Sequence, residues 1–154
     1  MPVVAEYSIR EARADEGEAL REIAFDAKSH WGYDRGCVRS WVSQGDFSPG
    51  ALRDRVVLVA EADGSAIGFA TLIPQGHVCV LDDLWIIPAW IGRRVGSKLF
   101  DESVYRAKQL GAERLEWEAE PNAIGFYEKV GGRYLRDSDP TELGRVIPVM
   151  GIDL

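Results

Sequence analysis

Apolar and polar residues follow two different periods along the chain, and each change of period marks a new element. Residues 6–12 alternate as a half-buried strand does, whereas residues 14–31 carry apolar side chains three and four apart, as one face of a helix does. A second helix is expected over residues 34–44. Asp15 and Glu18 suit the N-cap and N3 positions of the first helix.

The middle of the chain predicts a hairpin followed by a long central strand. Two apolar runs within residues 55–73 are joined by Asp63-Gly64, a dipeptide typical of tight hairpin turns. Residues 77–88 are apolar on both faces apart from two aspartates, which indicates a strand with neighbours on both sides. The segment 45–50 is expected to be a loop, because it is rich in glycine, serine and proline.

The last third of the chain continues the alternation of helices and strands. Residues 93–111 predict a long helix, 114–120 a strand, and 123–132 a short helix that ends at glycines. Two final strands are expected at 133–136 and 144–154, with a polar loop between them. The order predicts a single α/β domain over residues 1–154, with a mixed central sheet of about seven strands and about four helices.

Composition narrows the classes of function. The chain has 154 residues, 46% of them hydrophobic, and a formal net charge of −7, which argues against a nucleic-acid partner. Cys37 and Cys79 stand in apolar settings and are expected to be buried, reduced thiols of a cytoplasmic protein. His30 and His77 are far apart, so no metal site is expected. No apolar run has membrane length, so no membrane association is expected.

A glycine-containing loop precedes the long helix and is a candidate anion site. Gly92 and Gly96 lie four apart, with Arg93 and Arg94 between them and Lys98 close behind. The unpaired N–H groups and the dipole of a helix start attract phosphates, and glycine allows close approach. The spacing fits neither a P-loop nor a dinucleotide-binding fingerprint. An ordinary helix start with two solvated arginines is the alternative.

Two segments together decide between these alternatives. Residues 81–100, LDDLWIIPAWIGRRVGSKLF, and residues 118–132, EAEPNAIGFYEKVGG, resemble the two signature elements of the GNAT superfamily of N-acetyltransferases. The second matches the family pattern N-A-x-x-F-Y-E-K-x-G-F except at Gly132, where the family has phenylalanine. The first departs at Ile91, where the family has glutamine or arginine, and at Arg94, where it has glycine. The resemblance covers nearly the whole chain.

The resemblance implies a binding site for acetyl-CoA and no metal. In the GNAT fold, strands four and five splay into a V-shaped slot, and the pantetheine arm would pair there with the backbone of Leu84, Trp85 and Ile86. Asn122 would hydrogen-bond the arm, cap the short helix, or do both. The N–H of Ile86 would polarise the thioester carbonyl. The pyrophosphate would be held by the loop and the first helical turn, namely Gly92, Arg93, Arg94, Val95, Gly96 and Ser97.

Two residues are candidates for proton transfer. Tyr127 matches the tyrosine that serves as general acid towards the CoA sulfur in many family members, with packing beside Phe126 as the alternative. Asp82 matches the first acidic residue of a pair in polyamine acetyltransferases and is the candidate base. The alternatives are an aspartate satisfied by neighbouring backbone, and an ordered water that serves as base.

The acceptor is expected to be the primary amine of a small molecule. The first two helices form much of the acceptor site in this family, where Trp31 and Tyr33 would line it unless they pack the helical layer. Asp82, Asp83 and the acidic net charge favour a cationic amine or another small amino compound over a protein tail. A protein or peptide amine as acceptor, and a non-catalytic acyl-CoA-binding regulatory domain, are the alternatives. Homodimers are common in the family, so one is an open expectation.

Overall fold

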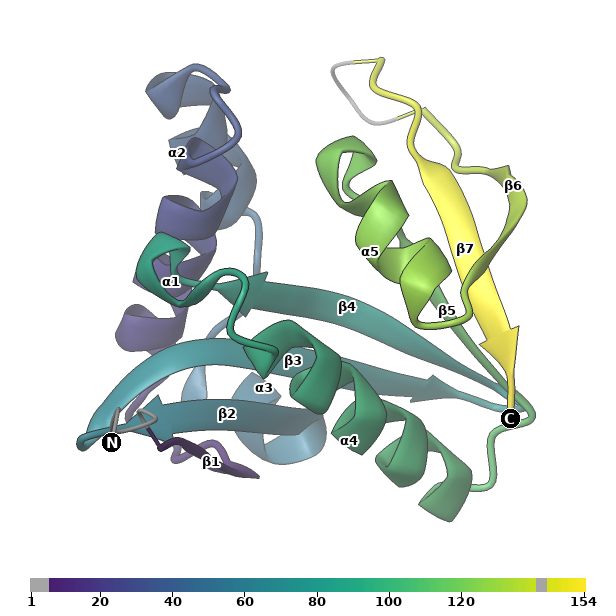
Figure 1. Cartoon of the computed structure of the whole chain (residues 1–154), viewed down its shortest axis with the longest axis horizontal. Helices are drawn as coiled ribbons and strands as arrows, with labels where there is room; N and C mark the ends of the chain where they lie inside the picture. Colours follow the sequence, from purple (N-terminus) through teal and green to yellow (C-terminus); the bar gives the residue numbers. More distant parts are fainter. Residues whose placement is uncertain (1–5, 141–143) are drawn as a thin grey trace, which may run out of the picture. The chain divides into compact units, whose positions relative to one another are not determined.

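The computed structural model describes residues 6–140 and 144–154, and these carry a mixed α/β fold (Figure 1). All seven strands belong to one sheet, in the order β1-β2-β3-β4-β5-β7-β6. The strands are β1 (Ser8–Glu11), β2 (Val56–Ala62), β3 (Ser65–Gln75), β4 (Val78–Ile86), β5 (Arg114–Glu118), β6 (Arg133–Asp137) and β7 (Pro148–Asp153). The α-helices are α1 (Gly17–Ser29), α2 (Arg35–Ser43), α3 (Pro49–Asp54), α4 (Val95–Gln109) and α5 (Ile124–Lys129). Short 3-10 helices cover Pro88–Trp90 and Pro121–Ala123.

The contacts of the chain group it into two compact units. Unit 1 holds the described residues up to Thr71 together with Asp83–Leu99, and unit 2 holds Leu72–Asp82 with the described part of Phe100–Leu154. Strands β3 and β4 and helix α4 contribute residues to both units. Each unit is therefore described by itself.

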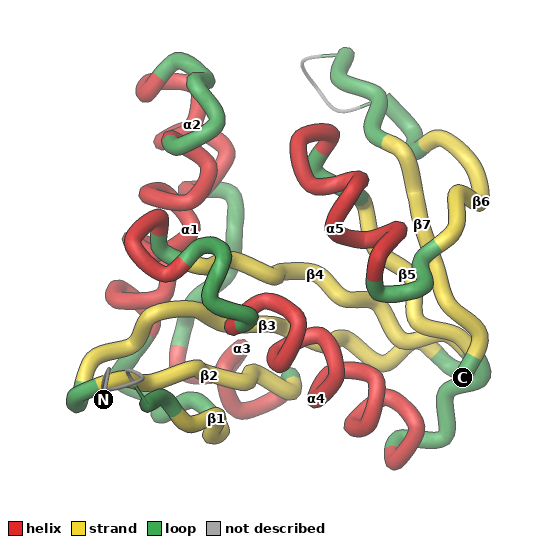
Figure 2. The backbone as a smooth tube through the Cα atoms, viewed as in Figure 1, coloured by secondary structure: helices red, strands yellow, loops and turns green. Residues whose placement is uncertain are grey.

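Unit 1 is built around the apolar stripe that its first helix presents. Leu20, Ile23, Ala24 and Ala27 are buried, as their helical spacing predicts. Helices α1 and α2 lie side by side (Figure 2). Their apolar faces share one core with Phe69 of β3, which is fully buried. Burial of each large side chain of this kind contributes roughly 1.5–3 kcal/mol, which is why the helices stay on the sheet.

The predicted hairpin in unit 1 is confirmed. Asp63 and Gly64 both have positive φ, 51° and 78°, the backbone that a type I′ turn requires. β1 adds to the outer side of β2 as an antiparallel strand, with Ser8 opposite Glu61 and Glu11 opposite Leu58.

Unit 2 is built around β5. Its strand β7 pairs with β5 along the whole length of β5 and with β6 on its other side, both antiparallel. Helix α5 lies beside β5 (Figure 1). The Tyr127 ring of α5 packs against the Trp117 ring of β5, with 5.0 Å between the ring centroids. The parallel ladder between β4 and β5 covers only Val78–Val80 opposite Arg114–Glu116.

The predicted fold class is confirmed, with a few local differences. The α/β class, the seven strands and the mixed sheet agree with expectation, but the described chain has five α-helices. The additional one is α3, which begins inside the segment expected to be a loop. Ser48 caps it by accepting from the Ala51 N–H, and Pro49 occupies its first turn, so a loop-like composition starts a helix here. The polar loop expected before the last strand falls partly on residues 141–143, outside the described residues.

Two single-residue expectations are wrong. Cys37 is exposed, because it lies in the first turn of α2 outside the buried positions Val38 and Val42; Cys79 is buried as expected. Asp15 does not cap α1, whose N-cap position is Glu16 with no side-chain cap bond. No helix of the described residues is long and apolar enough to cross a membrane.

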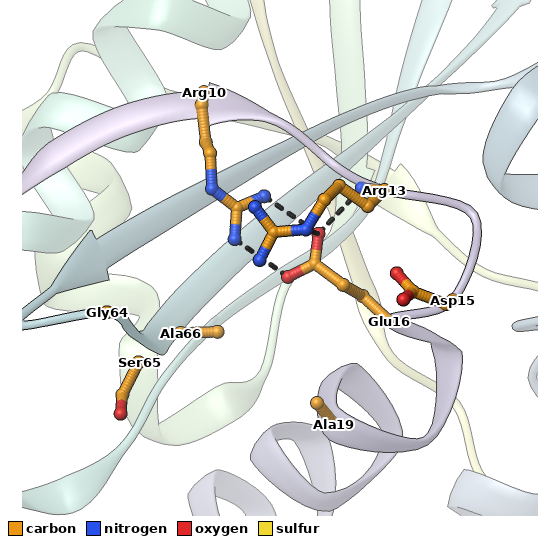
Figure 3. Close-up of a pocket in the computed structure, with 8 residues that line it drawn as sticks. All are labelled: Arg10, Arg13, Asp15, Glu16, Ala19, Gly64, Ser65 and Ala66. Carbon is orange, nitrogen blue, oxygen red and sulfur yellow. Dashed lines mark hydrogen bonds and ion pairs between the residues drawn. The ribbon is translucent and has the colours of Figure 1, made fainter.

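The Glu16 side chain is occupied by an ion-pair cluster instead (Figure 3). Its carboxylate accepts from Arg10 Nη1 and Nη2 at 2.7 and 2.8 Å and from the Arg13 backbone N–H at 2.6 Å. Arg10 also contacts Glu61 at 3.3 Å, so β1, β2 and the start of α1 are tied together. The cluster lies at an open pocket of about 440 Å³ whose lining includes Arg10, Arg13, Asp15 and Glu16. The hydrogen bond from Arg10 lowers the pKa of Glu16, against the opposing effect of burial.

Replacement of Glu16 by Gln tests this cluster. Because the folded-state pKa lies below the unfolded one, the ionised carboxylate stabilises the fold at neutral pH, and this is lost as pH falls through the folded-state pKa. We expect Glu16→Gln to cost about 1.5–3 kcal/mol of unfolding free energy at neutral pH, and the difference from wild type to shrink on acidification. Denaturant unfolding at a series of pH values measures both.

Glu18→Gln is the matched control, because the Glu18 side chain is 88% exposed. It should change the unfolding free energy by less than about 0.5 kcal/mol. Two results would contradict the stabilising role of the cluster. One is an equal change in unfolding free energy for both substitutions, and the other is a loss of unfolding free energy in Glu16→Gln that does not depend on pH.

Candidate active site

The end of β4 has two faces that contact different elements of unit 1. The Ile86 side chain packs beside Gly68 and Leu99, since a methyl group on Gly68 would lie 2.6 Å from Ile86 Cδ1 and 3.4 Å from Leu99 Cδ1. Trp85 points the other way and packs against the core that α1 and α2 share. On the β3 side the Ile87 N–H bonds the Ile67 carbonyl at 2.9 Å. The strand end is therefore held in place by packing and by β3.

The loop after β4 turns the chain into α4 through two left-handed residues. Gly92 has φ +82° and Arg94 has φ +65°. The left-handed region is easy for glycine and costs other L-residues roughly 1–2 kcal/mol. The left-handed backbone at position 94 therefore favours glycine. Arg94 adopts the same conformation at an energetic cost.

The first turn of α4 presents its amides as an anion site. Lys98 N–H donates to the Arg94 carbonyl at 3.1 Å, which is the first bond of the helix. The amides of Val95, Gly96 and Ser97 precede this bond, so they have no partner within the helix. With the helix dipole behind them, these N–H groups suit a phosphate or pyrophosphate.

Two aromatic residues hold this loop, and neither was expected from the sequence. The Tyr7 hydroxyl donates to the Arg94 carbonyl at 3.4 Å, and its ring meets the Trp90 ring edge-on at 6.1 Å. The Arg93 guanidinium lies 4.9 Å from the Trp90 ring centroid. Burial raises the pKa of Tyr7, so its hydroxyl stays protonated as a donor. Hydrogen bonding and ring packing therefore support the strained residue from the N-terminal side of the chain.

In unit 2, Tyr127 lies in an aromatic cluster. It is 6% exposed, and its ring contacts those of Phe100, Trp117 and Phe126 at 6.5, 5.0 and 5.2 Å. Trp117 also explains the departure at Gly132. A methyl group on Gly132 would lie 2.7 Å from Trp117 Cζ2, so the tryptophan occupies the space that a larger side chain at position 132 would need.

Asn122 lies at the exposed start of the short helical segment before Tyr127. Its Nδ2 donates to Glu120 Oε1 at 2.8 Å, and Glu120 holds the N-cap position of the 3-10 helix. The expectation that Asn122 caps the short helix is therefore wrong, because Ala123 is the N-cap residue of α5. The Glu120 contact orients the Asn122 amide from the protein side.

The candidate acceptor residues do not all come together. Asp83 Oδ1 accepts from Trp85 Nε1 at 3.2 Å, whereas Asp82 is exposed and alternates to the other face of β4. Tyr33 is half-buried and packs edge-on against Trp41, 5.3 Å away.

Trp31 stands apart from this group. It is 37% exposed and contacts the His30 ring at 5.1 Å. Neither Trp41 nor Lys28, which lies over both the Trp41 and the Trp85 ring, was a sequence candidate. The only feature of the sequence that could have identified them is a helical spacing that brings Lys28 and Trp41 to the buried sides of α1 and α2. Over the described residues no three His, Cys, Asp or Glu side chains form a metal-binding group.

Comparison with known proteins agrees with this geometry. The model of the acetyltransferase (GNAT) family matches residues 17–132. A comparison with curated protein sequences gave no significant match.

Three solved structures illustrate the likeness in fold. PaiA N-acetyltransferase from Thermoplasma acidophilum, in complex with coenzyme A, has TM-score 0.82 and 22% identity, covering 97% of this chain and 99% of that one. A GCN5-related N-acetyltransferase from Rhodopseudomonas palustris has TM-score 0.83 and 23% identity, covering 100% and 99%. The protein yncA from Salmonella typhimurium, with its cofactor acetyl-CoA, has TM-score 0.69 and 20% identity, covering 96% and 94%.

The left-handed backbone at Arg94 makes a direct prediction for stability. Arg94→Gly and Arg94→Ala both remove the charge, but only glycine relieves the backbone. We expect Arg94→Gly to be more stable than Arg94→Ala by about 1 kcal/mol in denaturant unfolding. The same pair at Lys98, inside the helix, should show the opposite order, because alanine is the better helix former. If Arg94→Ala equals or exceeds Arg94→Gly, the strain at this position is absent.

Proposed function

Because the chain belongs to the acetyltransferase (GNAT) family, we propose that it transfers the acetyl group of acetyl-CoA to the primary amine of a small molecule. The observation that carries the proposal is the start of α4, where two left-handed residues turn three first-turn amides into an anion site directly after β4. The pyrophosphate of acetyl-CoA binds at this place, with Gly92, Arg93, Arg94, Val95, Gly96 and Ser97 around it. Arg93 and Arg94 add positive charge from their side chains.

The pantetheine arm runs from this loop along the end of β4. The amides of the pantetheine arm pair with the backbone of Leu84, Trp85 and Ile86 as a further strand would. The short β4–β5 ladder supports this assignment, because the pairing of β4 with β5 stops at Val80 over the described residues. The Asn122 amide hydrogen-bonds the arm, oriented by Glu120. The Ile86 N–H points at the thioester carbonyl oxygen and stabilises the negative charge that develops there.

The reaction is a direct attack of the amine on the thioester. The amine nitrogen forms a bond to the acetyl carbon, and the carbon–sulfur bond breaks to release CoA. Asp82 accepts the proton of the amine, directly or through water, and Tyr127 donates a proton to the leaving sulfur. The aromatic cluster fixes the Tyr127 ring, as a general acid requires. Asp83 and Tyr33 contact the acceptor, with Trp31 at the exposed margin.

A panel of small primary amines with acetyl-CoA, read by the appearance of free CoA thiol and of acetylated amine, tests the proposed function. Acetylation of at least one amine is expected. Tight binding of acetyl-CoA without thiol release would identify a non-catalytic acyl-CoA-binding domain. Acetylation of a peptide amine, with no small amine accepted, would identify a protein acetyltransferase.

Tyr127→Phe tests the general acid within the same assay. The substitution removes only the hydroxyl, so the fold is kept and kcat should fall by roughly 10²–10⁴. Tyr105→Phe is the control, since Tyr105 is 56% exposed on α4 and should leave kcat unchanged. A wild-type rate in Tyr127→Phe would remove Tyr127 from the mechanism and leave it as a packing residue.

Asp82→Asn tests the base through the pH dependence of kcat/KM. If Asp82 takes the proton of the amine, the substitution should lower kcat/KM by roughly 10² and remove its contribution to the acidic limb of the pH–rate profile. Asp83→Asn is the comparison, since it changes the neighbouring carboxylate and should raise KM while the acidic limb persists. An acidic limb that is unchanged in Asp82→Asn would indicate that ordered water serves as the base.

A further inference from the structure

Unit 1 holds one lysine side chain between two tryptophan rings. Lys28 lies in the last turn of α1, and its Nζ is 5.2 Å from the ring centroid of Trp41 on α2 and 5.2 Å from that of Trp85 on β4. Both distances are within the range of a cation–π interaction. Lys28, Tyr33, Trp41, Asp83 and Trp85 are together called the Lys28 box.

The rings of the Lys28 box are fixed by their surroundings. Tyr33 meets Trp41 edge-on, with 5.3 Å between the ring centroids and 81° between the planes. Tyr33, Trp41 and Trp85 all pack against the buried core of α1, α2, β2 and β3. Trp85 is fixed further because its Nε1 donates to Asp83 Oδ1 at 3.2 Å. These packed rings cannot easily rotate, so they fix the position of the Lys28 ammonium.

The Lys28 box brings opposite charges to two parts of one ring system. The Lys28 ammonium lies over the face of Trp85, and the Asp83 carboxylate lies at its N–H edge. All five residues are half-buried, so solvent still reaches them while the surrounding protein strengthens their electrostatic interactions. A cation over the face of this ring and a carboxylate at its edge suit a ligand that itself carries both charges.

The Lys28 box adjoins the place where acetyl transfer is proposed. Trp85 is the immediate neighbour of Ile86, whose N–H is assigned to the thioester carbonyl. A doubly cationic acceptor would bring a second positive charge towards Lys28, which costs energy at short range. A carboxylate on the acceptor would meet Lys28 favourably, and its amine would meet Asp83.

We propose that the acceptor is a small amine that also carries a carboxylate, and that Lys28 of the box recognises the carboxylate. The inference rests on the proposed function for the transfer step and adds the class of acceptor. It replaces the expectation of a simple cationic amine that the acidic net charge favoured. Lys28 then determines specificity and takes no part in the proton transfers.

Matched amine pairs that differ only in the carboxylate test this proposal. Tyrosine against tyramine, phenylalanine against phenylethylamine, and arginine against agmatine serve as pairs with acetyl-CoA. Wild type should give the higher kcat/KM for the carboxylate-bearing member in the pair whose side chain fits. Lys28→Met, which keeps the length and removes the charge, should lower that value by roughly 10- to 100-fold, chiefly through KM. Its kcat/KM for the matching amine without a carboxylate should not fall.

Two further variants make the test specific. Lys28→Arg keeps the charge and should retain most of the preference for the carboxylate. Retention in this variant would show that the loss in Lys28→Met comes from the missing charge and not from misfolding. Lys108→Met removes an exposed charge at the far end of α4 and should change neither member of a pair. Equal loss for both members in Lys28→Met, or a wild-type preference for the amines without a carboxylate, would overturn the proposal.

Calorimetry separates failure of this inference from failure of the proposed function. The same pairs are titrated into wild type and into Lys28→Met without acetyl-CoA. Tighter binding of the carboxylate member, lost in Lys28→Met, supports the Lys28 box even where no acetyl transfer is detected. Acetyl transfer with no such difference in binding or in KM keeps the proposed function and overturns the inference.

Discussion

The backbone between β4 and α4 is the constraint on which the functional part of unit 1 depends. A strand must end, turn and start a helix within a few residues, and the first-turn amides must still point outwards. Two left-handed residues, Gly92 and Arg94, meet this demand. Arg94 meets it at a cost that glycine would avoid, and residues such as Arg94 persist where the surroundings over-determine them. Tyr7 is part of those surroundings, since its hydroxyl bonds the Arg94 carbonyl and its ring packs on Trp90.

At the end of β4, the two faces of the strand and its backbone have separate roles. One face of the strand is committed to packing, because Ile86 fills the space beside Gly68 and Leu99. The opposite face carries Asp83 and Trp85 towards the helices α1 and α2. The backbone between the faces is what remains for a ligand to pair with once the β5 ladder has stopped. The proposed cofactor and acceptor can thus bind to adjacent residues without competing for the same side chains.

Much of the fold could be predicted from the sequence, because its signals are local. The α1 stripe, the Asp63-Gly64 turn and the succession of strands along the chain follow from periodicity and turn chemistry that act over a few residues. Helix α3 and the N-cap of α1 were missed for a related reason. Glu16 is drawn away from capping by Arg10, and Pro49 begins a helix in a segment that reads as a loop. In both cases a specific contact or position outweighed composition.

The site shows a sharper division between what sequence does and does not reveal. The motifs located the anion loop and Tyr127, but they could not supply Tyr7, nor Lys28 and Trp41 of the Lys28 box, whose contacts arise only from packing between distant segments. Two of the three departures from the family pattern, Arg94 and Gly132, have different physical reasons. The backbone conformation at position 94 favours glycine over Arg94, whereas the volume of the Trp117 ring explains Gly132. The Trp117 ring also packs against Tyr127 at 5.0 Å, so the volume that excludes a larger residue at position 132 also holds the ring of the proposed general acid in place.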